Sequence, residues 1–414
     1  MSELLSQQAR SCKLASRSVA WLSTAQKDAL LQAVAAELRA QSERILAANL
    51  LDCQAGQAAG MTAALLDRLR LSPERIESMA QGAEQVARLP DPVGREVAWT
   101  RPNGLLIRKV RVPLGVLCMV YEARPNVTIE SASLALKSGN ACLLRGSRSA
   151  AQSNAVLVDI VQQCLRAQGL PAEAVQAVAD LRRESIDVLG RLRGLIDLMI
   201  PRGGAELIQR VVQGSQVPVL ETGVGNCHLY VHHSADLDMA CPLIVNSKCS
   251  RPAVCNSLET LLVDRQVAAA LLAQLGPQLQ QRGVEVRGCP DTLALLGWGT
   301  PASEADWDTE FLDLILAVRL VDDLSQALQH IALHGSGHTE AIVTRELEAA
   351  RRFQREVDAC AVNVNASTRF TDGGEFGFGA EIGISTQKMH ARGPVGLEEL
   401  TTCKYWVEGQ GQVR

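Results

Sequence analysis

The sequence predicts an α/β fold with two doubly wound domains and a small β arm. Short apolar runs alternate with helical segments between residues 116 and 220, and the alternation starts again after Glu221. Ahead of the first α/β region, residues 101–104 (RPNG) form a turn signal between two short extended runs. Strands that alternate with helices favour parallel sheets, and a turn between extended runs favours a hairpin.

The N-terminal region, residues 2–88, has the apolar spacing of helices. Apolar residues recur three and four positions apart, as in Leu30, Val34 and Leu38. Residues 89–92 (LPDP) end this region. We expect residues 99–112 to form a two-stranded arm and residues 405–407 to form a terminal strand.

Both α/β regions are built from short strands and longer helices. In the first we expect strands at 116–121, 141–144, 175–178, 195–200 and 217–220, and helices at 127–137, 152–168, 184–192 and 203–213. In the second we expect strands at 227–231, 257–263, 314–320, 341–343 and 361–364, and helices at 236–248 and 266–280. The sequence contains no internal repeat.

Composition excludes several classes of protein. The 414 residues are 47% hydrophobic and 21% charged, which is typical of globular proteins with a large core. The net charge of −4 offers no general attraction to nucleic acid or to an anionic membrane. No apolar stretch is long enough to span a bilayer and the N-terminus lacks an apolar signal core, so we expect a cytoplasmic protein. The twelve cysteines include no CxxC pair, which argues against a disulfide framework or a zinc ribbon.

The common catalytic and nucleotide-binding signatures are absent. No GxGxxG follows the first strand, and neither a P-loop nor an HExxH or GxSxG motif occurs. His330, His334 and His338 recur every four residues, but Gly335 and Gly337 should end the helix before the third histidine. We therefore expect no metal.

The most informative segment is residues 246–263 (NSKCSRPAVCNSLETLLV), which places Cys255 in a connection between a helix and a strand. Thiolates are strong nucleophiles, so Cys255 is the candidate catalytic residue. Cys249 is the competitor, but the preceding helix should continue through it. Two turns, residues 145–148 (RGSR) and 201–204 (PRGG), could bind a phosphorylated ligand or could be ordinary turn chemistry.

Taken together, six segments resemble the γ-glutamyl phosphate reductases, a family of the aldehyde dehydrogenase superfamily. They are residues 112–146, 200–208, 217–231, 250–263, 321–342 and 364–397. The resemblance implies a cofactor-binding domain with an atypical Rossmann arrangement at residues 1–97 and 113–225, and a catalytic domain at 226–397. It also implies an oligomerisation arm at residues 98–112 and 398–414, whose strands should pair near Tyr405 within one subunit or between two.

The reaction implied by the resemblance is the NADPH-dependent reduction of L-glutamyl 5-phosphate to L-glutamate 5-semialdehyde and phosphate, the second step of proline synthesis from glutamate. It would proceed through a thioester on Cys255. By similarity, Asn126 would stabilise the tetrahedral oxygen. The remaining assignments are cofactor binding by Arg145, Gly203, Gly204, Glu221 and Glu310, and substrate binding by Arg124, Arg251, Arg369 and His338, with Lys388 as a further cation.

Several alternatives stay open at this point. Glu221 matches the glutamate that activates water in aldehyde-oxidising relatives, so the chain could instead oxidise another semialdehyde hydrolytically; Glu221 could equally be structural or position the cofactor. A non-catalytic scaffold is the second alternative, and the intact Cys255 segment argues against it. The turn at residues 146–149 departs from the Gly-Gly-Ser-Glu-like family pattern. The implied partners are the small-molecule substrate, a separate glutamate 5-kinase that supplies it, and further copies of the chain.

Overall fold

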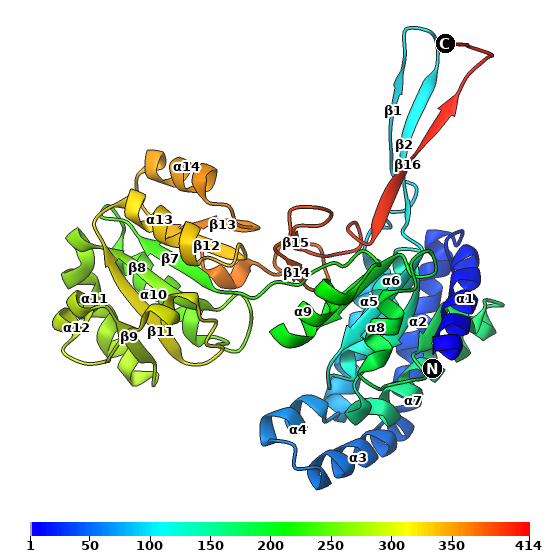
Figure 1. Ribbon diagram of the computed structural model, residues 1–414, viewed down its shortest axis with the longest axis horizontal. Helices are drawn as coiled ribbons and strands as arrows, with labels where there is room; N and C mark the ends of the chain where they lie inside the picture. Colours follow the sequence, from blue (N-terminus) through cyan, green and yellow to red (C-terminus); the bar gives the residue numbers. More distant parts are fainter. Residues whose placement is uncertain (1) are drawn as a thin grey trace. The chain divides into compact units, whose positions relative to one another are not determined.

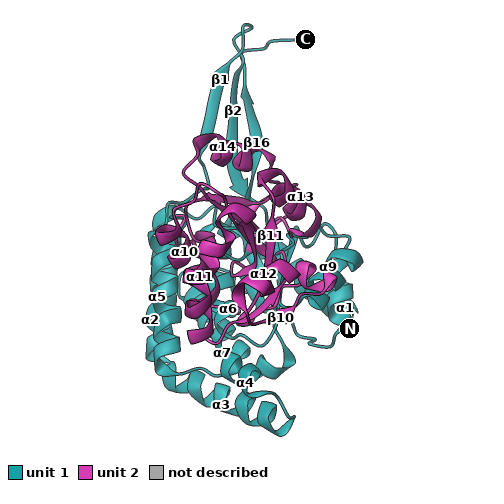
Figure 2. Cartoon of the chain, turned by 90° about the vertical axis from the view of Figure 1, so that its left-hand side faces the viewer, with its two compact units in different colours: residues 1–222, 377–383, 395–414 teal, residues 223–376, 384–394 magenta. Residues whose placement is uncertain are grey.

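The computed structural model describes residues 2–414 (Figure 1). The chain forms two compact units (Figure 2). Unit 1 runs to residue 222 and also includes residues 377–383 and 395–414. Unit 2 contains residues 223–376 and 384–394. The C-terminal part of the chain therefore alternates between the units.

Unit 1 begins with the expected helical region. Its helices are α1 (Ser2–Val19), α2 (Thr24–Ala40), α3 (Ser42–Ala58), α4 (Ala63–Leu69) and α5 (Pro73–Arg88). Helix α2 starts at a capping box made by Ser23 and Gln26, and α5 starts at Ser72 with a proline in its first turn. The two helices pack side by side and bury the apolar positions that the spacing had indicated, such as Val34.

The first α/β region forms a four-stranded parallel sheet in the order β5-β4-β3-β6. Its strands are β3 (Val116–Tyr121), β4 (Ala141–Arg145), β5 (Val175–Ala177) and β6 (Leu198–Arg202). The connections contain helices α6 (Asn126–Lys137), α7 (Ala151–Ala167), α8 (Glu184–Gly190) and α9 (Ala205–Gly214) and short 3-10 turns η1 (Arg148–Ala150) and η2 (Ala172–Ala174). Every residue of β3 and β4 is buried, as expected for a sheet covered on both faces.

Two expected strands differ in the structure. Strand β6 begins three residues later than predicted, because the amides of Leu195 and Ile196 both bond back to the carbonyl of Leu192 in a turn. The run at residues 217–220 makes only an isolated bridge, between Met199 and Val219. Pro218 lies in this run, and proline has no N–H to donate to a ladder.

The arm is a three-stranded antiparallel sheet in the order β1-β2-β16 that projects away from the rest of unit 1 (Figure 1). Strands β1 (Glu96–Thr100) and β2 (Leu106–Pro113) form the expected hairpin. Strand β16 (Thr401–Glu408) pairs with β2, and Tyr405 lies opposite Lys109. The pairing near Tyr405 thus occurs within one chain.

Unit 2 is organised around a seven-stranded parallel sheet in the order β10-β9-β11-β8-β7-β12-β13. The strands are β7 (Cys227–Val231), β8 (Leu258–Asp264), β9 (Glu285–Gly288), β10 (Thr300–Pro301), β11 (Ile315–Val321), β12 (Thr339–Val343) and β13 (Ala361–Val364). The helices are α10 (Leu237–Cys249), α11 (Arg265–Gln281), α12 (Pro290–Leu296), α13 (Leu324–His334) and α14 (Leu347–Glu356). Shorter elements are η3 (Glu304–Asp308), η4 (Thr368–Phe370), β14 (Ile384–Ser385) and β15 (Gly393–Pro394). Strands β9, β10, β14 and β15 and helices α12 and α14 were not predicted.

Hydrophobic cores lie on both faces of this sheet. Leu261 and Val263 of β8 belong to one core, whereas Leu262, between them, belongs to the other, which also contains Phe353 of α14. Alternate residues of a strand point to opposite faces, so a strand that is covered on both sides is apolar throughout. Each of the twelve cysteines is a thiol and not half of a disulfide. Among residues 2–414, no helix combines the length and apolar character that a membrane span requires.

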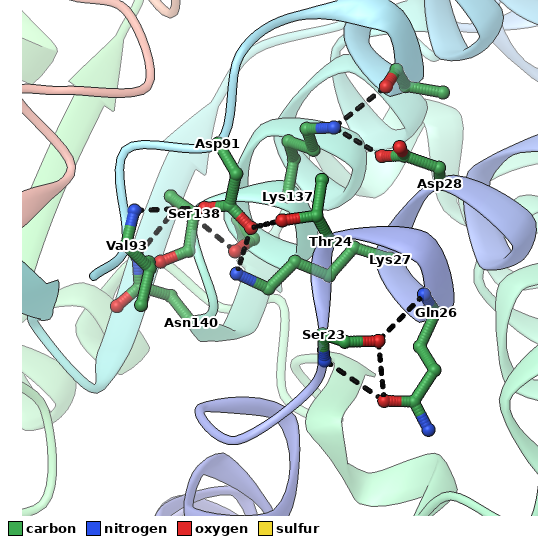
Figure 3. A network of polar contacts seen from close by, with 12 residues as sticks. Ser23, Thr24, Gln26, Lys27, Asp28, Asp91, Val93, Lys137, Ser138 and Asn140 are labelled. Atoms are coloured by element: carbon green, nitrogen blue, oxygen red, sulfur yellow. Dashed lines mark hydrogen bonds and ion pairs between the residues drawn. The ribbon is translucent and has the colours of Figure 1, made fainter. Parts of the chain in front are cut away.

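Buried charges join the helices of unit 1 (Figure 3). Lys27 of α2 is fully buried and lies 2.8 Å from a carboxylate oxygen of Asp91. Lys137 of α6 is also fully buried; it pairs with Asp28 and donates to the carbonyl of Ala87 at 2.7 Å. Each lysine thus has an anionic partner inside the helical layer, which offsets the cost of burying its charge.

Candidate active site

Cys255 lies on the loop between α10 and β8, at the amino end of the unit 2 sheet. Its side chain is half-buried. The amide of Ser257 donates to the carbonyl of Val254 at 3.0 Å, which closes the turn around Cys255. Ligands of open parallel sheets usually bind at the carboxyl ends of the strands, and this loop is at the opposite end. Cys249 is the last residue of α10, as predicted.

The backbone on the C-terminal side of Cys255 is held by the turn η4. The side-chain amide of Asn256 donates to the carbonyls of Arg369 at 3.3 Å and Thr371 at 2.9 Å. In return, the hydroxyl of Thr368 donates to the carbonyl of Asn256 at 2.7 Å. These bonds are buried and reciprocal, so they restrict the loop to one conformation.

The segment that leads into β7 packs directly against Cys255. A Cβ built on Gly225 would lie 1.6 Å from the carbonyl oxygen of Cys255, so only glycine fits there. The amide of Gly225 donates to Oε1 of Glu310 at 2.8 Å, and the thiol of Cys227 donates to the Cys255 carbonyl at 3.2 Å. Burial raises the pKa of Cys227 well above its usual range, which keeps this thiol protonated as a donor.

Asn226 fixes the same segment from its other side. Its side-chain amide donates to the carbonyls of Trp307 at 2.7 Å and His334 at 2.8 Å, and its backbone amide donates to the hydroxyl of Ser336 at 3.0 Å. Residues 225–227 are therefore tied to the end of α13 and to η3, and they in turn support Cys255.

Arg369, one of the predicted substrate-binding residues, lies near Arg251 and Cys255. Burial lowers the pKa of Arg369, the neighbouring charge of Arg251 lowers it further, and the charges of Asp372 and then Cys255 oppose both effects. Nε of Arg369 is buried and has no hydrogen-bond partner among residues 2–414. Buried guanidinium donors are rarely left unpaired, so this nitrogen is available to an acceptor from a bound molecule.

The other two predicted residues of unit 2 are more enclosed. Burial raises the pKa of Glu310, and the Gly225 amide partly counters this effect. His338 is fully buried, and burial lowers its pKa to about 4. The ring is therefore neutral at pH 7 and supplies no positive charge to an anionic ligand. Its Nδ1 lies 2.8 Å from the hydroxyl of Thr339.

The remaining histidines of the repeat and Lys388 lie apart from this arrangement. His330 and His334 are on α13, whereas His338 follows the end of that helix, as predicted. His330 and His334 line a pocket of about 160 Å³ together with Arg319. Lys388 forms an exposed ion pair with Asp358 at 2.5 Å.

In unit 1, the crevice expected at a topological switch point lies beyond β3 and β6. These strands are neighbours, although the chain visits β4 and β5 between them. A Cβ on Gly203 would lie 2.7 Å from the carboxyl carbon of Glu122 and 2.9 Å from Cδ2 of Leu207, so these side chains would have to shift to admit a larger residue. Gly204 caps α9 without a side-chain hydrogen bond, which leaves the first amides of the helix for an anion.

Two of the other predicted residues of unit 1 follow β3, and a third follows the segment beside β6. Arg124 and Asn126 are exposed and follow β3, and burial together with the charges of Arg68 and Arg202 lowers the pKa of Arg124. Glu221 is half-buried at the end of the segment beside β6.

Arg145 has a structural role that the sequence did not reveal. It is 8% exposed, and its guanidinium donates to the carbonyls of Leu181 at 2.9 Å and Arg182 at 3.1 Å. Arg148, by contrast, is exposed in the turn η1 that follows β4. Arg148 is therefore the more accessible of the two arginines that could contact a phosphate here.

Comparisons with known proteins agree with this geometry. Residues 3–292 match the model of the aldehyde dehydrogenase family. The γ-glutamyl phosphate reductase of Carboxydothermus hydrogenoformans is 54% identical over 407 residues, which cover 98% of each chain. That of Heliobacterium modesticaldum is 53% identical over 99% of each chain. The chain belongs to the γ-glutamyl phosphate reductases of the aldehyde dehydrogenase family.

A solved structure supports the same assignment. The crystal structure of the γ-glutamyl phosphate reductase of Thermotoga maritima superposes with a TM-score of 0.97 at 45% identity, and the match covers 99% of both chains. The predicted family and the predicted aldehyde dehydrogenase-like α/β fold are therefore confirmed. As a member of this family the chain is an oxidoreductase, and the scaffold alternative is wrong.

Sequence reasoning missed the residues that support Cys255. Gly225, Asn226 and Cys227 lie in one of the segments that carry the family resemblance, but their contacts join them to residues 28 to 110 positions away. The one available signal was the GxG spacing of Gly223 and Gly225, which by itself is indistinguishable from an ordinary turn.

Proposed function

We propose that this chain reduces L-glutamyl 5-phosphate to L-glutamate 5-semialdehyde and phosphate with NADPH, through a thioester on Cys255, as the second step of proline synthesis from glutamate. The observation that carries this proposal is the Cys255 turn. Its thiol is half-buried, and its backbone is supported by Gly225 and by the clamp on Asn256. The names of the relatives at 53–54% identity support the choice of substrate.

The first step is acyl transfer to sulfur. The Cys255 thiolate attacks the acyl carbon, a sulfur–carbon bond forms, and the bond from that carbon to the phosphate oxygen breaks as phosphate leaves with the electron pair. Phosphate is a good leaving group, so the site needs no strong general acid. In the second step a carbon–hydrogen bond forms with the hydride that NADPH would supply, the sulfur–carbon bond breaks, the aldehyde is released and Cys255 returns as thiolate.

Charge stabilisation in the proposed reaction comes from backbone and side-chain donors. The backbone N–H of Cys255 and the side chain of Asn126 would stabilise the tetrahedral oxygen. Arg251 and Arg369 would bind the anionic groups of the substrate, and the unpartnered Nε of Arg369 supports this role. Arg124 is the corresponding proposal in unit 1, whereas the neutral ring of His338 limits any contact with substrate to a hydrogen bond.

The switch point of unit 1 is the proposed dinucleotide site. Gly203 leaves room there for the side chain of Glu122, and the amide end of α9 after Gly204 would hold phosphate oxygens. NADPH, when bound, supplies the hydride that reduces the thioester. Arg148 is the better candidate for the 2′-phosphate, because the Arg145 guanidinium is committed to backbone carbonyls.

The two glutamates would contribute to the cofactor site in different ways. Only one carboxylate oxygen of Glu310 is used by Gly225, which leaves the other for the cofactor ribose. Glu221 would position the cofactor. If it acted as a base that activates water, the thioester would be hydrolysed before it could be reduced.

The assay that tests this function follows NADPH oxidation on addition of γ-glutamyl phosphate, or the reverse reaction with and without phosphate. We expect turnover to depend on phosphate in the reverse direction and NADPH to give a lower apparent Michaelis constant than NADH. Aldehyde oxidation that needs no phosphate would contradict the proposal and favour the hydrolytic alternative with Glu221 as base.

Two cysteine variants test the mechanism. Cys255→Ala should lower kcat by roughly 10³-fold or more, because the nucleophile is lost, while the thermal unfolding midpoint changes little. Cys249→Ala is the matched control in the same segment and should keep most of the activity. Equal losses in both variants would overturn the assignment of Cys255.

The proposal also concerns partners. An acyl phosphate is labile in water, so a separate glutamate 5-kinase would supply it directly before reduction. We further propose that the chain assembles into a homo-oligomer through its arm.

A further inference from the structure

A second cluster of functional side chains lies at the opposite end of the unit 2 sheet from Cys255. Strands β7 and β12 run in parallel with Val231 opposite Val343, so the residues that follow them leave the sheet side by side. His232 and His233 follow β7, and Glu346 lies shortly after β12. Strand β7 has β8 on one side and β12 on the other, which makes this the switch point at the carboxyl edge.

Three ligand-type atoms converge there. One nitrogen of each histidine and a carboxylate oxygen of Glu346 all lie within 4.8 Å of one another. The two imidazole centroids are 4.0 Å apart, and Nδ1 of His233 is 3.7 Å from Oε1 of Glu346. In a tetrahedral zinc site with bonds of about 2.0–2.2 Å, ligand atoms are separated by roughly 3.4 Å. The side chains of His233 and Glu346 are 38% and 49% exposed, so they can rotate to close the difference.

His232 is held in place by polar contacts to its Nδ1. This nitrogen lies 2.9 Å from Oγ of Ser234 and 3.1 Å from Oγ1 of Thr344, and the backbone amide of Ser234 donates to it at 3.4 Å. A cation at Nε2, the other ring nitrogen, would displace the proton of that nitrogen. The backbone around Thr344 is itself anchored, because its amide and carbonyl both bond to the side chain of Asn365 at 2.9 Å.

A nearby positive charge is already paired. Arg345, the nearest cation along the chain, is paired with Asp236 at 2.5 Å, so its charge is partly neutralised.

We propose that His232, His233 and Glu346 form a Zn²⁺ site in which solvent completes the coordination. Two imidazole nitrogens and one carboxylate oxygen are a set that zinc accepts, whereas Ca²⁺ and Mg²⁺ prefer oxygen ligands alone. The site joins the ends of two neighbouring strands, so bound metal stabilises unit 2. It is separate from the reduction at Cys255 and does not depend on the proposed function.

The test uses the full-length, metal-free protein with Zn²⁺ for affinity and Co²⁺ as a spectroscopic substitute. Wild type should bind one Co²⁺ with visible d–d bands but without a thiolate charge-transfer band, which distinguishes this site from the cysteines. His233→Ala and Glu346→Gln should each weaken Zn²⁺ binding at least about tenfold and remove the zinc-dependent rise in unfolding temperature. His390→Asn, at an exposed histidine with a positive φ that asparagine tolerates, is the control and should behave as wild type.

Two results would overturn the site. One is a wild-type protein that binds no Co²⁺ or Zn²⁺ at micromolar concentrations. The other is undiminished binding in both variants, which would assign the metal to other residues.

Discussion

The Cys255 loop depends on a close contact between its backbone and Gly225. Gly225 lies so close to the Cys255 carbonyl that a methyl group would have to displace the loop. We predict that Gly225→Ala lowers kcat by at least about tenfold, since a displacement of about 1 Å at a reacting group costs roughly that much or more. Steady-state kinetics and a thermal unfolding curve of the same preparation would measure it.

Gly82 provides the matched control for that substitution. It lies in helix α5, and a Cβ there meets nothing within 4 Å. Gly82→Ala should therefore keep full activity and stabilise the protein by about 0.5–1 kcal/mol, because alanine is the better helix residue. Activity of Gly225→Ala equal to that of Gly82→Ala would show that the loop tolerates the displacement.

The buried ring of His338 predicts a pH dependence of stability. Its pKa is about 4 in the folded chain and near 6.5 when unfolded, so below pH 6.5 the unfolded chain binds more protons. Its contribution to stability is therefore complete above pH 6.5 and is lost as the pH falls toward 4. Between pH 7 and pH 4.5 this loss amounts to roughly 2 kcal/mol. Denaturant unfolding of wild type and His338→Asn at both pH values would reveal it as a smaller loss in the variant.

At the scale of elements, buried ion pairs hold the helical layer of unit 1 together. Asp91→Ala would leave Lys27 buried and unpaired, and we predict that this costs about 3–5 kcal/mol of unfolding free energy. Glu77→Ala is the matched control, because Glu77 pairs with Arg39 between α2 and α5 at the surface, and it should cost less than about 1 kcal/mol. Similar costs in the two variants, measured by denaturant unfolding, would disprove the role of burial.

The elements themselves divide into those that the sequence predicted and those that it did not. Strand β3 matches its predicted range because it is covered on both faces and is an uninterrupted apolar run. Strand β10 is a short edge strand and β9 is the short strand next to it, and both include exposed residues, so their composition resembles that of a loop. The run at residues 217–220 was predicted to be a strand because it is apolar. It forms only an isolated bridge, because Pro218 has no N–H to donate to a ladder.

At the scale of the whole molecule, the arm leaves sheet edges and apolar side chains exposed. Val97 is 66% exposed on β1 and Val407 is 60% exposed on β16. Exposed strands of this kind generally pair with another chain. We predict that Val97→Lys combined with Val407→Lys reduces the mass of the assembly measured by light scattering, whereas Leu14→Lys, at an exposed leucine of α1, does not. An unchanged mass in the double variant would exclude the arm as the interface.

The sequence by itself determined the α/β class, the family and the identity of the candidate nucleophile, because alternating apolar runs and an unusual set of local motifs are properties of contiguous residues. Only the tertiary structure decided what surrounds them. The support of Cys255 by Gly225, the burial of Lys27 against Asp91 and the convergence of His232, His233 and Glu346 each join residues that are 30 or more positions apart in the chain. Such contacts depend on how the strands are ordered in the sheet and how the helices pack, and no local pattern records that order.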